Sequence, residues 1–220
     1  MPRSKRFRYG LLLILLLLGG GLWTYEAYWS WREASQDGVI LQAASLYGVE
    51  PALVKAVVWR ESRFNPRARG TKGEYGLMHL MPGTADEFLR AEKLTLAGRE
   101  GLYDPGLNTR AGTWYLRRLH RRYPAADDAI PYTLADYNAG RGNVLRWAQG
   151  AAATNSALFI QQITYPSTRD YVQAVMRRYQ RYRKTFPPPP PPKGEPTRAS
   201  AGREVGVGRS RPALVASETR

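Results

Sequence analysis

PALVKAVVWRES, residues 51–62, is the stretch that decides how the middle of this chain folds. It opens with Pro51, which suits the first turn of a helix because the nitrogen there needs no intrahelical partner. Val57 and Val58 belong to its apolar stripe. Glu61 lies four residues after Val57 and three after Val58, the spacing that places residues on the same face of a helix. The sequence therefore predicts a helix that buries one face and carries a carboxyl group at the end of that face.

Glu61 is the first candidate for chemistry. A carboxyl group on the core-facing side, at the negative end of a helix dipole, meets two effects that disfavour its ionised form. A protonated carboxyl group is what a general acid needs. The alternative is a solvated residue at the rim of the domain, paired with Arg60 or Arg63.

Helical patterns continue on both sides of this stretch, and no segment alternates as a strand would. The predicted fold class is therefore mainly α. Residues 62–83 are rich in Gly, Pro, Ser and Thr and predict a long ordered loop, a feature that is usually functional in a small domain. Ser167 and Asp170 form a candidate capping box for the last helix. The other predicted helices cover residues 37–47, 84–94, 108–123, 130–140, 144–147 and 168–182.

Composition limits what the domain can do. The chain has 220 residues, 33 Lys and Arg against 18 Asp and Glu, a formal net charge of +15, two His and no Cys. This length allows one ordinary domain with accessory segments. Disulfides, thiolate chemistry and histidine-rich metal clusters are excluded, so we expect no metal and no cofactor. The positive charge favours an anionic polymer as the partner.

The N-terminus predicts a membrane anchor. Residues 9–25 carry no charge and follow a basic segment, residues 1–8. This pattern favours a single span with a cytoplasmic N-terminus and an exported body, joined by a connector at residues 26–36. A cleaved secretory peptide is the alternative, and it would make the protein secreted.

The C-terminus predicts an extended proline rod at residues 187–192, within a disordered basic tail that covers residues 187–220. Such a tail is a possible binding segment for a protein partner.

Four short motifs follow one another in a fixed order between residues 37 and 186. With these motifs the chain resembles the catalytic domain of bacterial lytic transglycosylases of the soluble-transglycosylase type, relatives of goose-type lysozymes. They are Glu61-Ser62, Gly76-Leu77-Met78-His79, Tyr137-Asn138, and Thr168-Arg169 followed by Tyr171-Val172.

The resemblance implies a lysozyme-like helical domain with a long cleft-lining loop, in which Glu61 is the single catalytic acid. It implies cleavage of the β-1,4 bond between N-acetylmuramic acid and N-acetylglucosamine in peptidoglycan, with a 1,6-anhydromuramoyl product and no cofactor. The enzyme would be anchored in the inner membrane with its catalytic domain in the periplasm. We expect Tyr137 to hold Glu61 by a hydrogen bond and Asn138 to bind the acetamido group. The implied substrate-binding residues are Ser62, Gly76, Leu77, Met78, His79, Tyr137, Asn138 and Tyr171. Glu74, in the cleft-lining loop, is a further candidate for substrate binding, as an additional carboxylate that would position water. The alternative is a solvated loop charge beside Lys72.

Three positions depart from the family pattern. His79 stands where the family commonly has Gln, Ser167 where a Glu usually precedes Thr-Arg, and Asp136 where a small residue precedes Tyr-Asn. An imidazole offers hydrogen bonds differently from an amide, so substrate contacts at His79 are open.

Two other functions compete with the enzyme. The chain could be a non-catalytic peptidoglycan-binding or cell-envelope scaffold protein that keeps the fold. Basic runs interleaved with aromatic residues also suggest nucleic-acid binding. We expect no nucleic acid as a partner, because these cations fall on several helix faces and export would separate them from it.

Overall fold

The computed structural model describes residues 3–186, with side chains from residue 10 onward. The predicted proline rod and basic tail lie outside the described residues. Two short 3-10 helices, η1 (Arg99–Tyr103) and η2 (Gly150–Ala153), stand among the α-helices. The α-helices are α1 (Arg3–Ala34), α2 (Asp37–Tyr47), α3 (Pro51–Ser62), α4 (Pro82–Ala91), α5 (Pro105–His120), α6 (Ala129–Ala139), α7 (Arg141–Trp147), α8 (Ser156–Gln162) and α9 (Pro166–Thr185).

The mainly α fold is confirmed, and local signals explain most helix ends. Gly48 ends α2 with a φ of 61°, the left-handed conformation typical of a residue that follows a helix. Pro51 starts α3 as predicted. The side chain of Asp128 accepts a hydrogen bond from the backbone N–H of Ile130 and caps α6.

Three features differ from the sequence-based prediction. Helix α5 begins at Pro105, ahead of Asn108, because the side chain of Asp104 caps its first turn through Leu107 N–H. The predicted capping box of α9 is wrong, since that helix already begins at Pro166 and has no side-chain cap. Helix α8 was not predicted, because its seven residues are too few to show a clear period.

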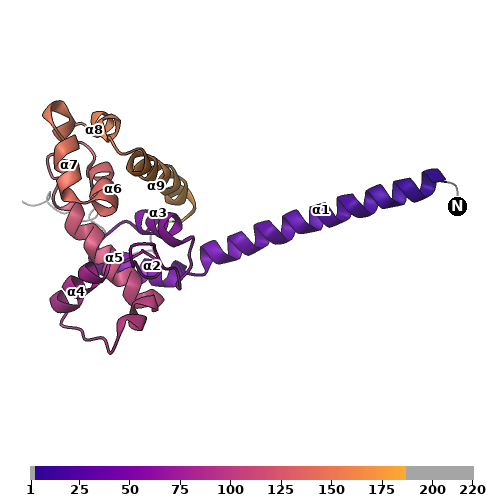
Figure 1. Ribbon diagram of the computed structural model, residues 1–220, viewed down its shortest axis with the longest axis horizontal. Coiled ribbons are helices and arrows are strands. Elements are labelled where there is room, and N and C mark those ends of the chain that lie inside the picture. The colour runs from indigo at the N-terminus through magenta and orange to yellow at the C-terminus, as the bar shows by residue number, and fades with distance from the viewer. Residues whose placement is uncertain (1–2, 187–220) are drawn as a thin grey trace, which may run out of the picture. The chain divides into compact units, whose positions relative to one another are not determined.

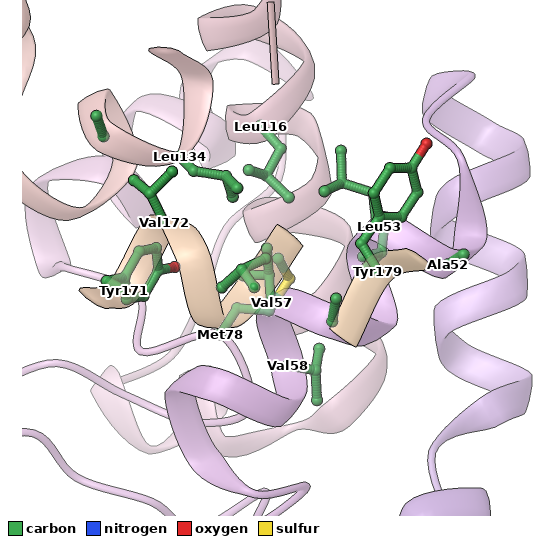
Figure 2. Close-up of a cluster of buried hydrophobic side chains, with 14 of the residues drawn as sticks. Ala52, Leu53, Val57, Val58, Met78, Leu116, Leu134, Tyr171, Val172 and Tyr179 are labelled. Atoms are coloured by element: carbon green, nitrogen blue, oxygen red, sulfur yellow. The ribbon is translucent and has the colours of Figure 1, made fainter. Parts of the chain in front are cut away.

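Helix α3 packs against α9, while α2 packs against α5 and α6 against α9 (Figure 1). These contacts bury α3 along most of its length, from Pro51 to Val58. Figure 2 shows the resulting core, in which Val57 of α3 and Met78 of the following loop lie close to Tyr171 and Val172 of α9. The C-terminal end of α3 is thereby fixed against both the loop and the start of α9.

Helix α1 carries the apolar N-terminal stretch. The side chains from Leu11 to Leu18 are all exposed, at 49% or more of their surface. Within the described residues, one helical stretch near the N-terminus is long and apolar enough to cross a membrane. A signal sequence can have the same length and apolar composition. The helix runs on without a break to Ala34, so most of the expected connector is helical.

Candidate active site

Glu61 lies in the last turn of α3 with 13% of its side chain exposed. The hydroxyl of Tyr171, in the first half of α9, donates a hydrogen bond of 2.6 Å to Glu61 Oε1. The contact joins residues 110 positions apart in the chain, and it exists because α3 and α9 pack side by side. Glu61 is therefore neither a solvated rim residue nor paired with Arg60 or Arg63 through an ion pair.

His79 faces the other oxygen of the same carboxyl group. Its Nδ1 lies 3.3 Å from Glu61 Oε2, and a quarter of its side chain is exposed. The backbone of His79 has a φ of 44°, in the left-handed region that few residues other than glycine adopt. The loop thus takes an uncommon conformation at the residue it presents to Glu61.

Asn108 holds this part of the loop in place from α5. Its buried side chain accepts a hydrogen bond from Met78 N–H at 2.9 Å and donates to Tyr75 O and Leu102 O, both at 2.8 Å. Gly76 has a φ of 72°, and a Cβ there would meet the Asn108 amide at 2.4 Å. A glycine at 76 is thus required both by backbone conformation and by the close approach of Asn108.

Tyr137 does not make the contact that the sequence led us to expect. Its hydroxyl donates to the backbone oxygen of Met78 at 2.7 Å, so it supports the loop, and Tyr171 is the residue that holds Glu61. Spacing along the chain could not distinguish these two tyrosines, since both lie far from Glu61 in sequence.

Both hydroxyls remain protonated over a wide pH range. Burial and then the negative charge of Glu61 hold the pKa of Tyr137 and the pKa of Tyr171 well above the usual value. Tyr171 can therefore act as a hydrogen-bond donor to Glu61 at any physiological pH.

The other expected site residues are placed differently. Leu77 and Met78 are fully buried in the core, and Gly76 is buried as well. Among the four motif residues 76–79, His79 is therefore the one with a partly exposed side chain. Ser62 is buried and donates a hydrogen bond of 3.2 Å to Val58 O within its own helix. Asn138 is exposed, and its Oδ1 accepts a hydrogen bond from Thr168 Oγ1 at 2.9 Å.

Glu74 takes part in the turn that contains it. Its Oε2 accepts a hydrogen bond from Lys72 N–H at 2.8 Å, and its backbone oxygen accepts one from Gly70 N–H at 3.0 Å. None of its hydrogen bonds among the described residues involves Glu61. Its side chain therefore has a local structural role, and its expected role at the cleft stays a prediction.

Asp136 has a structural role that explains one departure from the family pattern. The side chain is 1% exposed, with Arg122 Nη1 at 2.9 Å and the hydroxyl of Tyr123 at 2.6 Å from Oδ2. A buried carboxylate needs such partners, because an uncompensated charge is costly in the interior. Sequence reasoning missed both this cluster and Asn108, since a buried polar residue leaves no periodic signal.

Comparisons with known proteins agree with this helical site. The chain matches the model of the transglycosylase SLT domain over residues 38–160, more than half its length, and it belongs to that family. It is 33% identical over 133 residues to the soluble lytic murein transglycosylase of Escherichia coli K12, covering 60% of this chain and 20% of that protein. It is 37% identical over 115 residues to membrane-bound lytic murein transglycosylase C of Klebsiella pneumoniae, covering 50% of this chain and 32% of that protein.

Among solved structures, the chain resembles the lytic transglycosylase Slt of Pseudomonas aeruginosa with a TM-score of 0.63 and 31% identity, over 70% of this chain and 25% of that one. That protein was solved as an inactive mutant in which glutamine replaces a glutamate. The expected lysozyme-like helical fold is confirmed by this likeness. The chain spans between a fifth and a third of the length of these relatives.

Proposed function

We propose that the protein is a peptidoglycan lytic transglycosylase in which Glu61 acts first as a general acid and then as a general base. The bond cleaved is the β-1,4 bond between N-acetylmuramic acid and N-acetylglucosamine, and the product carries a 1,6-anhydromuramoyl end. The observation that carries the proposal is the hydrogen bond of 2.6 Å from the Tyr171 hydroxyl to Glu61 Oε1 on a largely buried carboxyl group.

This hydrogen bond indicates which carboxyl oxygen we expect to carry the proton. The unprotonated oxygen of a carboxyl group is the better acceptor, so the hydroxyl that donates to Oε1 favours a proton on Oε2. Oε2 is the oxygen that faces the partly exposed side chain of His79. Substrate is therefore expected to meet Glu61 on the His79 side.

The reaction balances without water. Glu61 gives its proton to the glycosidic oxygen as the bond from that oxygen to the anomeric carbon breaks. The 6-hydroxyl of the same muramic acid unit then forms the new bond to the anomeric carbon, and its proton passes to the Glu61 carboxylate. Because the nucleophile belongs to the substrate, its effective concentration is high, and no second carboxylate is required.

We further propose that α1 anchors the enzyme in the inner membrane and that the catalytic domain works in the periplasm. The exposed apolar run from Leu11 to Leu18 and the four upstream cations of the sequence support this arrangement. The resemblance to a membrane-bound relative is consistent with it. A protein partner for the proline-rich tail stays a prediction.

The test is digestion of purified sacculi by the full chain, followed by mass analysis of the released fragments. Wild type should release anhydromuramoyl fragments, and Glu61→Gln should release none, because an amide has no proton to give to the leaving oxygen. Glu100→Gln is the matched control, since it makes the same change at an exposed carboxylate outside the expected site residues. Glu74→Gln tests the loop carboxylate separately.

The outcomes separate the proposal from its rivals. Equal release by wild type and Glu61→Gln, or none by either together with retained binding to sacculi, would favour the non-catalytic scaffold. Release of reducing ends without anhydro ends would identify a hydrolase instead. Loss of release in Glu74→Gln alone would move the catalytic role to the loop.

A further inference from the structure

A hollow lies where the C-terminal part of α1 meets α3 and α9, and Glu61 does not line it. Its volume is about 500 Å³. We call it the anchor-side pocket. Its aromatic and cationic lining consists mainly of Tyr25, Trp29, Trp59, Arg63, Arg178 and Arg181.

Direct contacts fix the end of α1 against this pocket. Arg32 Nε donates a hydrogen bond of 2.8 Å to the backbone oxygen of Arg63, and Glu33 lies 3.8 Å from Arg178. Tyr25 and Trp29 of α1 therefore face side chains of α3 and α9 across a defined space.

The guanidinium groups around the pocket are crowded. The guanidinium carbons of Arg63 and Arg178 lie 3.9 Å and 4.2 Å from the ring centroid of Trp59. Burial, and then the positive charges of Arg178 and Arg60, lower the pKa of Arg63. An anion bound between these groups would relieve their mutual repulsion.

The two carboxylates that line the pocket neutralise only part of the charge of its three arginines. Of the two that line it, Glu33 is already paired with Arg178, which leaves Glu26. Within the described residues, Arg63 and Arg181 have no carboxylate partner closer than 4.0 Å. A neighbouring hollow that shares Trp59 adds a further cation, Arg177.

The pocket also lies at the right depth for a lipid head group. Tyr25 is the last residue of the uncharged stretch, so it marks the edge of the hydrocarbon layer if α1 spans a membrane. Glu33 lies eight residues further along the helix, about 12 Å at the helical rise of 1.5 Å per residue. The head-group layer on each side of a bilayer is about 5 to 8 Å thick, which falls within this distance.

We propose that the anchor-side pocket binds the phosphate of an anionic phospholipid head group and so docks the catalytic domain on the membrane surface. Guanidinium groups are suited to phosphate because they donate paired hydrogen bonds. The proposal rests on the proposed membrane anchorage. Docking would direct the enzyme to glycan strands close to the membrane.

The chain has no cysteine, so Gln180→Cys, at an exposed position of α9, gives one labelling site for a fluorophore. The full chain is reconstituted into vesicles of phosphatidylcholine, or of phosphatidylcholine with one lipid in three replaced by phosphatidylglycerol. Energy transfer from the label to an acceptor on the lipid head groups reports docking. Flotation of the vesicles reports anchorage separately, and sacculus digestion reports the proposed activity.

We expect greater energy transfer in the phosphatidylglycerol vesicles. Each arginine near an anionic surface should favour docking roughly fivefold. The double variant Arg63→Gln/Arg181→Gln should therefore lower the ratio of docked to undocked protein about 30-fold. The double variant Arg121→Gln/Arg146→Gln is the matched control, because it removes the same charge from exposed positions that do not line the pocket. Both double variants should float with the vesicles and digest sacculi as wild type does.

Equal transfer from the two kinds of vesicle, in protein that floats, would overturn docking and leave anchorage intact. An equal loss in both double variants would also overturn it, because net charge and not the pocket would then be responsible. A loss caused by inorganic phosphate, but not by chloride at the same ionic strength, would support the proposal, because free phosphate would then compete with the lipid phosphate for the pocket. Failure to float would overturn anchorage and docking together without affecting the proposed reaction.

Discussion

Removing one hydroxyl group tests the arrangement around Glu61 most directly. Tyr171→Phe deletes the donor to Glu61 Oε1 and keeps the buried ring in place. A hydrogen bond to a charged group contributes about 1.5 to 3 kcal/mol. If that contribution is lost from the transition state, the rate falls about 10- to 150-fold, at tenfold for every 1.36 kcal/mol.

Tyr137→Phe is the matched comparison, since it removes a hydroxyl that donates to a neutral backbone oxygen, that of Met78. A neutral hydrogen bond contributes about 1 kcal/mol, so the rate should fall about fivefold at most. The assay is the initial rate of anhydromuramoyl release over a range of glycan concentrations. For Tyr171→Phe we expect kcat to fall with KM nearly unchanged, because the hydroxyl group donates its hydrogen bond to the acid.

The reasoning would be refuted by a Tyr171→Phe enzyme with the wild-type kcat. It would also be refuted if Tyr137→Phe were the more damaging change, because Tyr137 would then hold Glu61 in the working enzyme. Thermal unfolding of both variants, measured alongside, separates a loss of catalysis from a loss of folded protein.

Three further predictions concern stability and loop position. Asn108→Ala removes the three hydrogen bonds of a buried side chain and should lower the free energy of unfolding by about 3 to 5 kcal/mol, measured by urea denaturation; a loss below about 1 kcal/mol would contradict the role assigned to Asn108. Gly112→Ala would place a Cβ 2.3 Å from the sulfur of Met78, so we expect activity to fall more than stability as the loop moves, and an unchanged sacculus-digestion rate would argue against this. Backbone N–H groups of Ser156 and Asp128 donate hydrogen bonds to the Asp127 carboxylate and lower the pKa of Asp127 in the folded protein. The contribution of Asp127 to folding stability is therefore complete above the ordinary carboxyl pKa of about 4, and it is lost as the pH falls through the lower pKa of the folded state. Asp127→Ala should therefore destabilise the protein at pH 7 by an amount that shrinks at acidic pH, and a constant difference in melting temperature would contradict it.

The sequence alone determined the helical class, the start of α3 and the position of Glu61 on it. These features depend on local rules: a proline suits a first turn, and residues three and four apart share a face. The order of four short motifs also carried the resemblance that the family match then confirmed. Such signals are readable because each is contained within a few neighbouring residues.

Only the tertiary structure decided which side chains surround Glu61. Tyr171 reaches it across 110 residues because α9 packs along α3, whereas Tyr137 meets the backbone of Met78. The place of His79 likewise depends on a loop held by Asn108, from a helix about thirty residues further along the chain. Hydrogen bonds of this kind are made after helices have packed, and their partners follow from packing geometry, which no spacing along the chain encodes.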